Sequence, residues 1–258
     1  MPDVAGATAT PLGGGDPSAG IEGYPAATVT PEQAGLTRDA LGSTRPLPLA
    51  VGAESLPLVP ADPPDQDEPL IPLAHLPRVV DLATYHAAGW PGAPVVGHAR
   101  AGAVSRLVAA AHLLPEGFGL AVFDAWRPLP LQRRIFDHFY GPGSALESGF
   151  VSAPSPSPAT PPPHLTGGTF DLTLTWQGRP LALGTAFDEF TPRSHTRALE
   201  REESLERDLR RLMADRLLRV GFVLYAAEWW HVEYGTRRWA AQWMTVPRYG
   251  VADPPEER

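Results

Sequence analysis

The sequence predicts an α+β fold with a mainly antiparallel sheet flanked by helices, and two observations lead to this prediction. Segments with the periodicity of helices and of strands follow one another in the order helix, strand, helix, loop, strand, helix, strand, strand, without internal repeats. The chain has 258 residues, of which 43% are hydrophobic, which is enough to bury one sizeable core or two small ones.

Each element is predicted from the spacing of its apolar residues and from the residues that end it. Residues 99–114 carry apolar side chains at helical spacing, and Pro115 ends that helix. Residues 169–176 alternate strictly, which places Asp171 on the polar face of a strand. The other predicted elements are, in chain order, a buried strand over 119–123, a helix from Pro128 that stops at Gly141, a stiff Pro-rich loop over 154–163, a long helix over roughly 196–220, strands over 222–226 and 230–234, and a short helix around Trp239 and Trp243.

Charge and proline are concentrated at the start of the chain. Residues 1–69 contain ten Asp or Glu, two Arg and twelve Pro, and they lack a sustained period of 2 or 3.6. Such a segment buries too little apolar surface to offset its chain entropy, so we expect a disordered or loosely docked acidic arm. The alternative is that residues 45–60 lie as an extended strand on the body. We expect a folded domain over 70–250, which holds the candidate functional residues described below, and a tail over 251–258.

Composition excludes several classes of function. The formal charge of −8 disfavours a nucleic-acid partner held by a basic surface. The absence of Cys excludes disulfides, a thiolate nucleophile and Cys-ligated metals, and the absence of Lys excludes a P-loop and a Schiff-base Lys. No apolar run approaches the ~20 residues of a membrane span, and no secretory signal is visible. We therefore expect a soluble cytoplasmic protein without a membrane partner.

Polar residues that would be unusual in a core lie in three segments, and the first two combine with turn signals. Asp124 and Arg127 end an apolar strand just before a helix, where Arg127 can reach an anion, although a simple ion pair closing the turn is the alternative. The turn at 167–168 can bring His164 next to Asp171, a pair of nitrogen and oxygen ligands that suits zinc. The alternative for this pair is a surface His and a strand Asp without a metal.

The third segment places His231 inside an aromatic-rich strand with two nearby glutamates. A His in such a strand is usually a core residue, but a neighbouring Glu makes a metal ligand with a general base plausible. Alternation puts His231 on the face of Glu233 and opposite Glu228, unless the chain bends near Trp229. The spacing alone therefore leaves Glu228 and Glu233 open as the base.

Taken together, the three segments supply two His, one Asp, a free Glu and an Arg. Three protein ligands with an open fourth position are typical of a catalytic zinc rather than a structural one. The sequence contains no Gly-x-Ser-x-Gly, no His-Glu-x-x-His and no Gly-x-Gly-x-x-Gly motif. Metal-assisted chemistry is therefore favoured over a serine nucleophile or dinucleotide binding.

At these residues the sequence resembles the D-alanyl-D-alanine dipeptidases, which are zinc peptidases related to the D-Ala-D-Ala carboxypeptidases and to the hedgehog zinc domain. The family pattern Ser-x-His-x-x-Gly-x-Ala-x-Asp-x-Thr-Leu is matched from His164 to Leu174, with Pro162 in place of its Ser and Thr169 in place of its Ala. The Glu-x-Trp-His ending is matched over 228–231, Asp-x-Tyr-Arg-Pro appears over 124–128 with a Trp, and residues 184–190 are similar to the dipeptidase branch. The resemblance covers roughly residues 78–245.

The resemblance implies zinc bound by His164, Asp171 and His231, with Glu228 as the base and Arg127 near the scissile group. It thereby favours Glu228 over Glu233. The implied reaction is hydrolysis of a small D,D-dipeptide. The expected binding partner is this dipeptide substrate. Two alternatives stay open: a related zinc D,D-carboxypeptidase or L,D-peptidase acting on peptidoglycan fragments, and a zinc-binding module without catalytic activity. The oligomeric state is left open by the sequence.

Overall fold

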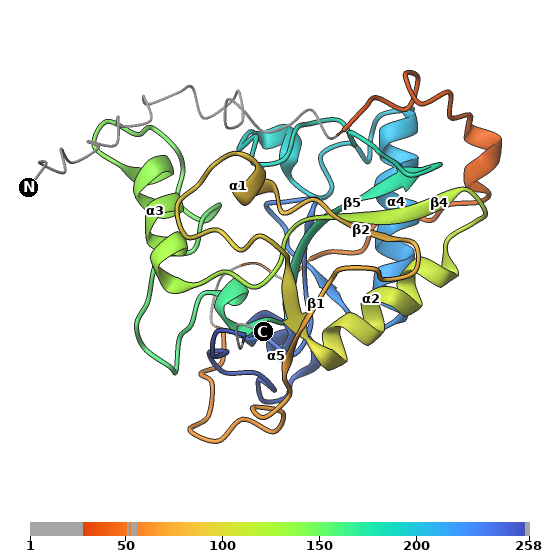
Figure 1. Ribbon diagram of the computed structural model, residues 1–258. Coiled ribbons are helices and arrows are strands. Elements are labelled where there is room, and N and C mark those ends of the chain that lie inside the picture. Colours follow the sequence, from red (N-terminus) through yellow and green to blue (C-terminus); the bar gives the residue numbers. More distant parts are fainter. Residues whose placement is uncertain (1–27, 51, 53–55, 256–258) are drawn as a thin grey trace, which may run out of the picture.

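The protein, seen here in a computed structural model that describes residues 28–50, 52 and 56–255, has a mixed α/β fold (Figure 1). The α-helices are α1 (Thr84–Ala87), α2 (Ala101–Leu113), α3 (Leu129–Tyr140), α4 (Leu205–Arg219) and α5 (Arg237–Trp243), and three short 3₁₀ helices are η1 (Arg38–Leu41), η2 (Pro163–Thr166) and η3 (Pro192–Ser194). The strands are β1 (Leu70–Pro72), β2 (Val79–Asp81), β3 (His98–Arg100), β4 (Phe118–Asp124), β5 (Thr169–Trp176), β6 (Arg179–Pro180), β7 (Val223–Leu224) and β8 (His231–Glu233). Among the described residues no helix is long and apolar enough to cross a membrane.

The main sheet has the strand order β2-β4-β5-β8-β7, and β6 pairs with β5 beside this path. The β2–β4 pair is parallel, whereas β4–β5, β5–β6, β5–β8 and β7–β8 are antiparallel. Strands β1 and β3 form a separate antiparallel pair. The two central strands, β4 and β5, are buried almost throughout, and this accounts for their nearly continuous apolar or Thr-rich sequences.

Helices α2 and α4 pack against each other and against the sheet, α2 on β4 and α4 on β5 and β7. Helix α3 lies on the opposite side of the molecule from this pair (Figure 1). The apolar stripe of α4, with Leu209, Leu212 and Leu217 fully buried, faces the core as its spacing predicts. Helices α2 and α4 therefore support the sheet on one side. The strand ends on the side of α3 are left to form a site.

The register of the sheet aligns three polar residues across adjacent strands. Asp124 at the end of β4 is the register partner of Asp171 in β5, and Asp171 is the register partner of His231 in β8. A register shift between Val122 and Asp124 precedes this row. Because neighbouring strands lie about 5 Å apart, residues from positions 124, 171 and 231 are brought within side-chain reach of one another.

Two glycines make the turn that leads from η2 into β5. Gly167 has a φ of 74°, in the left-handed region, and a Cβ there would lie 2.5 Å from Leu70. A Cβ on Gly168 would lie 2.2 Å from the carbonyl oxygen of Tyr234. A side chain at either position would therefore clash with its surroundings. The predicted tight reversal between His164 and Asp171 is present.

The prediction of a disordered or loosely docked arm over residues 1–69 is wrong for the part that the structure describes. Leu36, Leu41 and Leu47 are buried in the same hydrophobic core as residues between Leu73 and Tyr249. Val29 forms a parallel bridge with Leu181. The described residues within 45–60 are not assigned to a strand, so the alternative of an extended strand does not hold either. Residues 1–27, 51 and 53–55 of the predicted arm lie outside the described residues.

Polar contacts also fasten the end of this arm to the C-terminal part of the chain. Arg237 donates to the carbonyl oxygens of Leu56 and Pro57 at 2.9 and 2.7 Å, and Tyr249 donates to Glu68 at 2.9 Å. The predicted tail is attached as well, since the backbone of Ala252 donates to Leu165 at 2.9 Å. These apolar and polar contacts are non-local, which is why the periodicity of the arm did not predict them.

The long helix predicted over 196–220 begins later than expected, at Leu205. Ser204 caps it by accepting a hydrogen bond from the backbone of Arg207 at 3.2 Å. Upstream, Thr196 donates through its hydroxyl to the carbonyl oxygens of Tyr225 and, at 3.0 Å, Glu228. The residues before 205 therefore serve as a connection tied to the β7–β8 segment rather than as a first turn of the helix.

Candidate metal centre and active site

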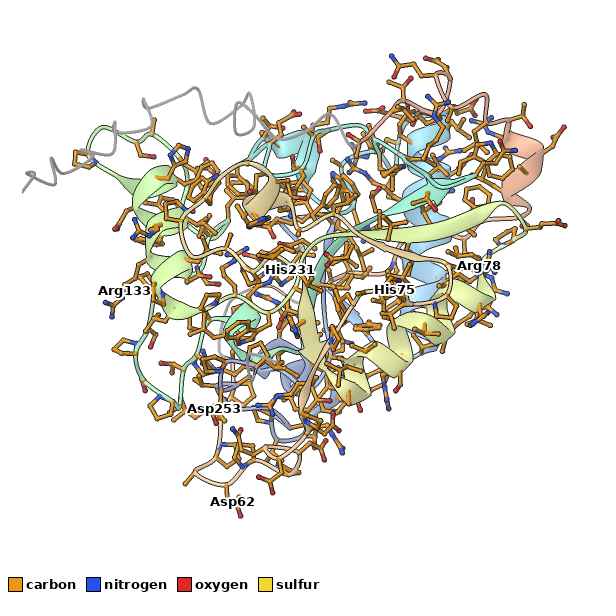
Figure 2. The ribbon with its side chains drawn as sticks, viewed as in Figure 1. Asp62, His75, Arg78, Arg133, His231 and Asp253 are labelled. Atoms are coloured by element: carbon orange, nitrogen blue, oxygen red, sulfur yellow. The ribbon has the colours of Figure 1, made fainter. Side chains whose placement is uncertain are left out.

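Three of the residues singled out by the sequence meet at one point. His164, Asp171 and His231 each offer one ligand atom, and these atoms all lie within 4.8 Å of one another. All three side chains are buried, and His231 lies near the middle of the molecule, far from peripheral residues such as Arg133 and Asp62 (Figure 2). The elements that position them are η2, β5 and β8, which the register and the glycine turn hold together.

The distances among the ligand atoms fit a zinc ion. Asp171 lies between the two imidazoles, with Oδ2 at 3.2 Å from Nε2 of His164 and Oδ1 at 3.0 Å from Nδ1 of His231. Ligands about 2.0–2.1 Å from a tetrahedral zinc are roughly 3.3 Å apart, close to both separations. The donor set of two nitrogens and one carboxylate oxygen is also one that zinc accepts at catalytic sites.

Both imidazoles are oriented by hydrogen bonds on the side away from Asp171. The Nδ1 atom of His164 lies 2.7 Å from the carbonyl oxygen of Ala125, and Nε2 of His231 lies 3.0 Å from Oε1 of Glu233. Because a carbonyl and a carboxylate accept hydrogen bonds, each ring can donate an N–H there, which would leave its other nitrogen to face a metal ion beside Asp171. Burial acts to raise the pKa of Asp171, but His164 and His231 outweigh it and hold this pKa below its usual range.

Glu228 reaches the same point because the chain bends between β7 and β8. Bends at 226–227 and 229–230 interrupt the strand pattern, and they place Oε2 of Glu228 at 3.5 Å from Nδ1 of His231. Burial raises the pKa of Glu228 well above its usual range. Glu233, in contrast, contacts the opposite edge of the His231 ring. The bend that the sequence required for a shared site is therefore present.

Arg127 extends this group of charges at the end of β4. Its Nε donates to Asp124 at 2.9 Å, its Nη1 donates to Gln132 at 2.9 Å, and its Nη2 lies 3.7 Å from Oδ2 of Asp171. The ion pair between Arg127 and Asp124 is thus formed, yet the guanidinium also faces the candidate metal ligands. Both interpretations of this segment, an ion pair and a functional cation, are compatible with the geometry.

A cavity of about 20 Å³ lies among these groups, and residues that the sequence argument gave no role help to line it. They include Tyr85, Gln132 and Asp188, and the Tyr85 hydroxyl donates to Asp188 at 2.8 Å. Asp188 is buried and has a φ of 57°, a left-handed conformation that Asp adopts more readily than most residues. Asp188 falls within the 184–190 stretch that is similar to the dipeptidases, whereas Gln132, buried in α3, was not singled out by the sequence.

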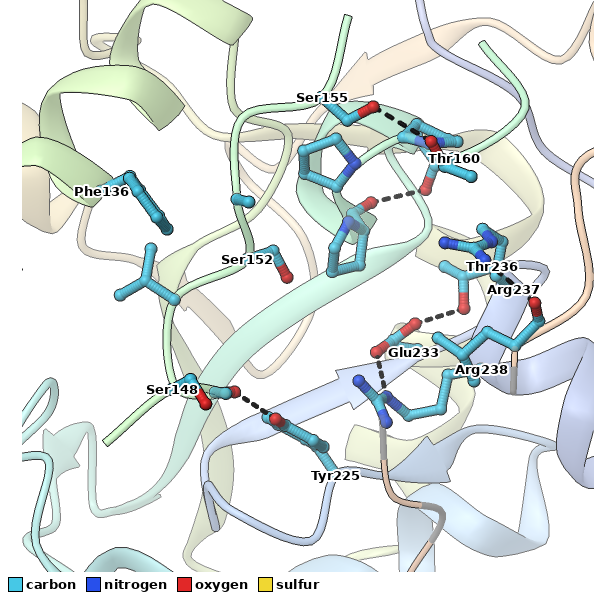
Figure 3. A pocket seen from close by; sticks show the side chains of 18 of the residues that line it. Phe136, Ser148, Ser152, Ser155, Thr160, Tyr225, Glu233, Thr236, Arg237 and Arg238 are labelled. Atoms are coloured by element: carbon cyan, nitrogen blue, oxygen red, sulfur yellow. Dashed lines mark hydrogen bonds and ion pairs between the residues drawn. The ribbon is translucent and has the colours of Figure 1, made fainter. Parts of the chain in front are cut away.

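A second cavity of about 610 Å³ adjoins the first, and both are lined by Val151, Ser152 and Pro163 (Figure 3). The Pro-rich loop over 154–163 forms part of its wall, as do Tyr225 and the ion pair between Glu233 and Arg238. The two cavities lie on different sides of His231, since Glu228 lines the small one and Glu233 the large one.

A family model described as D-ala-D-ala dipeptidase, peptidase M15, matches residues 84–248, which include all five predicted site residues. The chain belongs to this family. The match confirms the resemblance that the motifs indicated, and it extends over α1 to α5 without the arm.

Two curated relatives carry the same description. The chain is 30% identical over 216 residues to a protein named D-alanyl-D-alanine dipeptidase from Synechocystis sp. (strain ATCC 27184 / PCC 6803 / Kazusa), with 69% of this chain and 87% of that protein covered. It is 33% identical over 135 residues to a protein of the same name from Streptomyces coelicolor (strain ATCC BAA-471 / A3(2) / M145), with 45% of this chain and 61% of that one covered. Membership in a family of peptidases makes the protein a hydrolase.

Proposed function

We propose that the protein is a zinc-dependent dipeptidase that hydrolyses D-alanyl-D-alanine or a similarly small dipeptide. The observation that carries this proposal is the convergence of His164, Asp171 and His231 next to the buried carboxylate of Glu228. A structural metal needs no neighbouring base, so Glu228 and Arg127 favour a catalytic centre over an inactive metal-binding module. The family and the names of the relatives support the same activity.

His164, Asp171 and His231 would hold the zinc ion. When bound, zinc supplies an activated water and polarises the carbonyl of the scissile peptide bond. Asp171 contributes one negative charge to the ligand set, and the hydrogen bond to the carbonyl oxygen of Ala125 keeps the imidazole of His164 in place. A cytoplasmic location and a fold of the hedgehog and D,D-peptidase type are part of this proposal.

Glu228 is proposed as the general base and then the general acid. It takes a proton from the attacking water as the C–O bond forms, and it gives that proton to the leaving nitrogen as the C–N bond breaks. Burial raises the pKa of Glu228, which suits a carboxylate that must accept and release a proton. Its position at 3.5 Å from His231 places it at the edge of the metal centre.

Arg127 is proposed to stabilise the negative charge that develops on the carbonyl oxygen. Its guanidinium is buried and held by Asp124 and Gln132, so little reorganisation is needed when that charge appears. Losing one such donor typically costs on the order of 3–4 kcal/mol in the transition state, or ~10²–10³ in rate.

A further residue that lines the small cavity, Asp188, suits the amino end of a dipeptide. Asp188 adds a buried carboxylate there, and Tyr85 orients it by donating a hydrogen bond. An ammonium group placed against Asp188 would gain a charge-assisted hydrogen bond in a site with little water. A cavity of about 20 Å³ has room for about one water, so the surrounding side chains must move when a dipeptide enters.

A second candidate is a related zinc D,D-carboxypeptidase or L,D-peptidase that acts on peptidoglycan fragments. The observation that favours it is the neighbouring cavity of about 610 Å³, which offers space for a substrate longer than a dipeptide. The family match and the names of the two relatives favour the dipeptidase.

The test is a substrate panel with zinc-loaded protein and metal analysis of the same sample. We expect hydrolysis of D-Ala-D-Ala, with little turnover of the L,L-dipeptide and of peptides that end in D-Ala-D-Ala. Turnover of the longer peptides in preference to the dipeptide would favour the carboxypeptidase. No hydrolysis of any member by protein that holds zinc would contradict the proposal.

A further inference from the structure

Glu233 is a buried carboxylate that the proposed reaction does not use, although it touches a proposed metal ligand. Its Oε1 lies 3.0 Å from Nε2 of His231, and its side chain is almost wholly buried. His231 and Glu233 are two residues apart in β8, so the pleat of the strand places both side chains on one face. The contact is therefore built into the strand and does not depend on a loop.

Both oxygens of Glu233 are held in place by further donors. Arg238 donates through Nε to Oε1 at 2.6 Å, and Thr236 donates its hydroxyl to Oε2 (Figure 3). The guanidinium of Arg238 is in turn stacked 3.9 Å from the centre of the Tyr225 ring and donates to the carbonyl oxygen of Gly52. Glu233 thus has a fixed position, with its charge paired and each of its oxygens accepting a hydrogen bond.

The geometry decides which role this carboxylate can take. Glu228 and Asp171 contact the Nδ1 edge of the His231 ring, whereas Glu233 contacts the Nε2 edge. The Nε2 edge faces away from the proposed zinc, so Glu233 is out of reach of a water bound there. A fixed acceptor on the far edge of an imidazole can instead determine the tautomer and the direction of the ring.

We propose that Glu233, anchored by Arg238 and Thr236, is a positioning residue that fixes the N–H of His231 on Nε2 and so directs Nδ1 toward the zinc. This inference rests on the proposed function. His164 is oriented differently, since its Nδ1 lies 2.7 Å from the backbone carbonyl oxygen of Ala125 and 3.4 Å from Oδ2 of Asp124, whereas Nε2 of His231 has a carboxylate at hydrogen-bond distance. A carboxylate acceptor raises the basicity of its imidazole, which strengthens His231 as a nitrogen ligand.

The variant Glu233→Gln tests this proposal through metal affinity. Gln keeps the volume but removes the charge from the acceptor, and its amide can turn a donor toward His231. We expect zinc to bind ~10–100-fold more weakly in competition with a chelator, which is the usual effect of losing such a partner. We also expect the visible spectrum of the cobalt-substituted protein to change, because the direction of one ligand changes.

Glu202→Gln is the matched control, because Glu202 also pairs with an arginine, Arg193, but at the surface. It should retain the zinc affinity and the cobalt spectrum of the unmodified protein. Glu233→Asp keeps the charge on a shorter side chain and should recover part of the zinc affinity lost in Glu233→Gln.

An unchanged zinc affinity and cobalt spectrum in folded Glu233→Gln would overturn the proposal and leave Glu233 a purely structural role. If circular dichroism shows that this variant does not fold, Glu233→Asp decides: a several-fold weaker affinity supports the proposal, and an unchanged affinity overturns it. Failure of the proposed function would give a different result from failure of the proposal about Glu233. In that case the unmodified protein itself would bind no zinc or hydrolyse none of the dipeptides.

Discussion

The small cavity has one wall carried by the sheet and another carried by connecting segments, and the two are held in different ways. On the sheet, Asp124, Asp171 and His231 are register partners in three adjacent strands, so the hydrogen-bond ladder fixes their spacing. On the connections, Glu228 and Asp188 depend on bends and on contacts with distant elements. The proposed ligands thus lie mainly on the more rigid wall.

The connecting wall is anchored by a helix rather than by strands. Arg210 of α4 is buried and donates hydrogen bonds to the carbonyl oxygens of Leu183, Arg193 and His195, on both sides of Asp188. Such a segment can change its substrate contacts without disturbing the sheet. In the proposed function, metal binding belongs mainly to the sheet, with His164 supplied by η2, and base catalysis and substrate selection belong to the connections; each prediction below tests that division.

The largest effect is expected at Glu228, on the connecting wall. Glu228→Gln removes the proposed base and should lower kcat by ~10²–10⁴-fold, because a positioned proton acceptor contributes that much. Zinc content, measured by metal analysis, should be unchanged, since His164, Asp171 and His231 remain. Full activity in the variant would remove Glu228 from the mechanism. Loss of zinc would show that metal binding also depends on the connecting wall.

A smaller effect is expected at Asp188. Asp188→Asn removes the charge proposed to bind the substrate ammonium and should lower kcat/KM for D-Ala-D-Ala by about 10–100-fold, the range for losing a hydrogen bond to a charged group. Zinc content should again be unchanged. The N-acetylated dipeptide has no ammonium and serves as the control substrate. An equal loss with both substrates would mean that Asp188 does not contact the amino end.

The smallest effect on catalysis is expected from the N-terminal segment, which packs behind the sheet. Leu41→Ala creates a cavity at a fully buried side chain and should lower the free energy of unfolding by about 2–5 kcal/mol. Leu49, which is 81% exposed, provides the matched control, and Leu49→Ala should change stability by less than about 0.5 kcal/mol. Chemical denaturation measures both. Equal stabilities would restore the view of this segment as a loosely docked arm.

The elements near the site could be predicted because their signals are local. Strand β5 spans the predicted residues 169–176, and the Gly167-Gly168 turn follows from the glycines themselves. The choice between Glu228 and Glu233 could not be made from alternation, because it depends on a bend in the chain before β8. The burial of Leu36 and Leu41 was missed because side chains in irregular segments are buried by tertiary contacts that leave no period in the sequence.

The sequence identified only some of the residues of the connecting wall, because their positions also depend on tertiary contacts. Asp188 belongs to a loop whose position is set by Arg210, more than twenty residues further along the chain. Gln132 is buried on the apolar side of α3, where it links Arg127 to the carbonyl oxygen of Ser152 at 2.6 Å. The contacts of Arg210 with the loop of Asp188, and of Gln132 with Ser152, leave no pattern in the sequence. In each case the partner is distant along the chain or lies in a loop.

Metal stoichiometry tests the central claim most directly. Protein purified in the presence of zinc should hold about one zinc ion per chain, and His164→Ala, Asp171→Ala and His231→Ala should each lose it while staying folded by circular dichroism. Retention of zinc in all three variants, or its absence from the unmodified protein, would contradict a metal centre built from these three side chains.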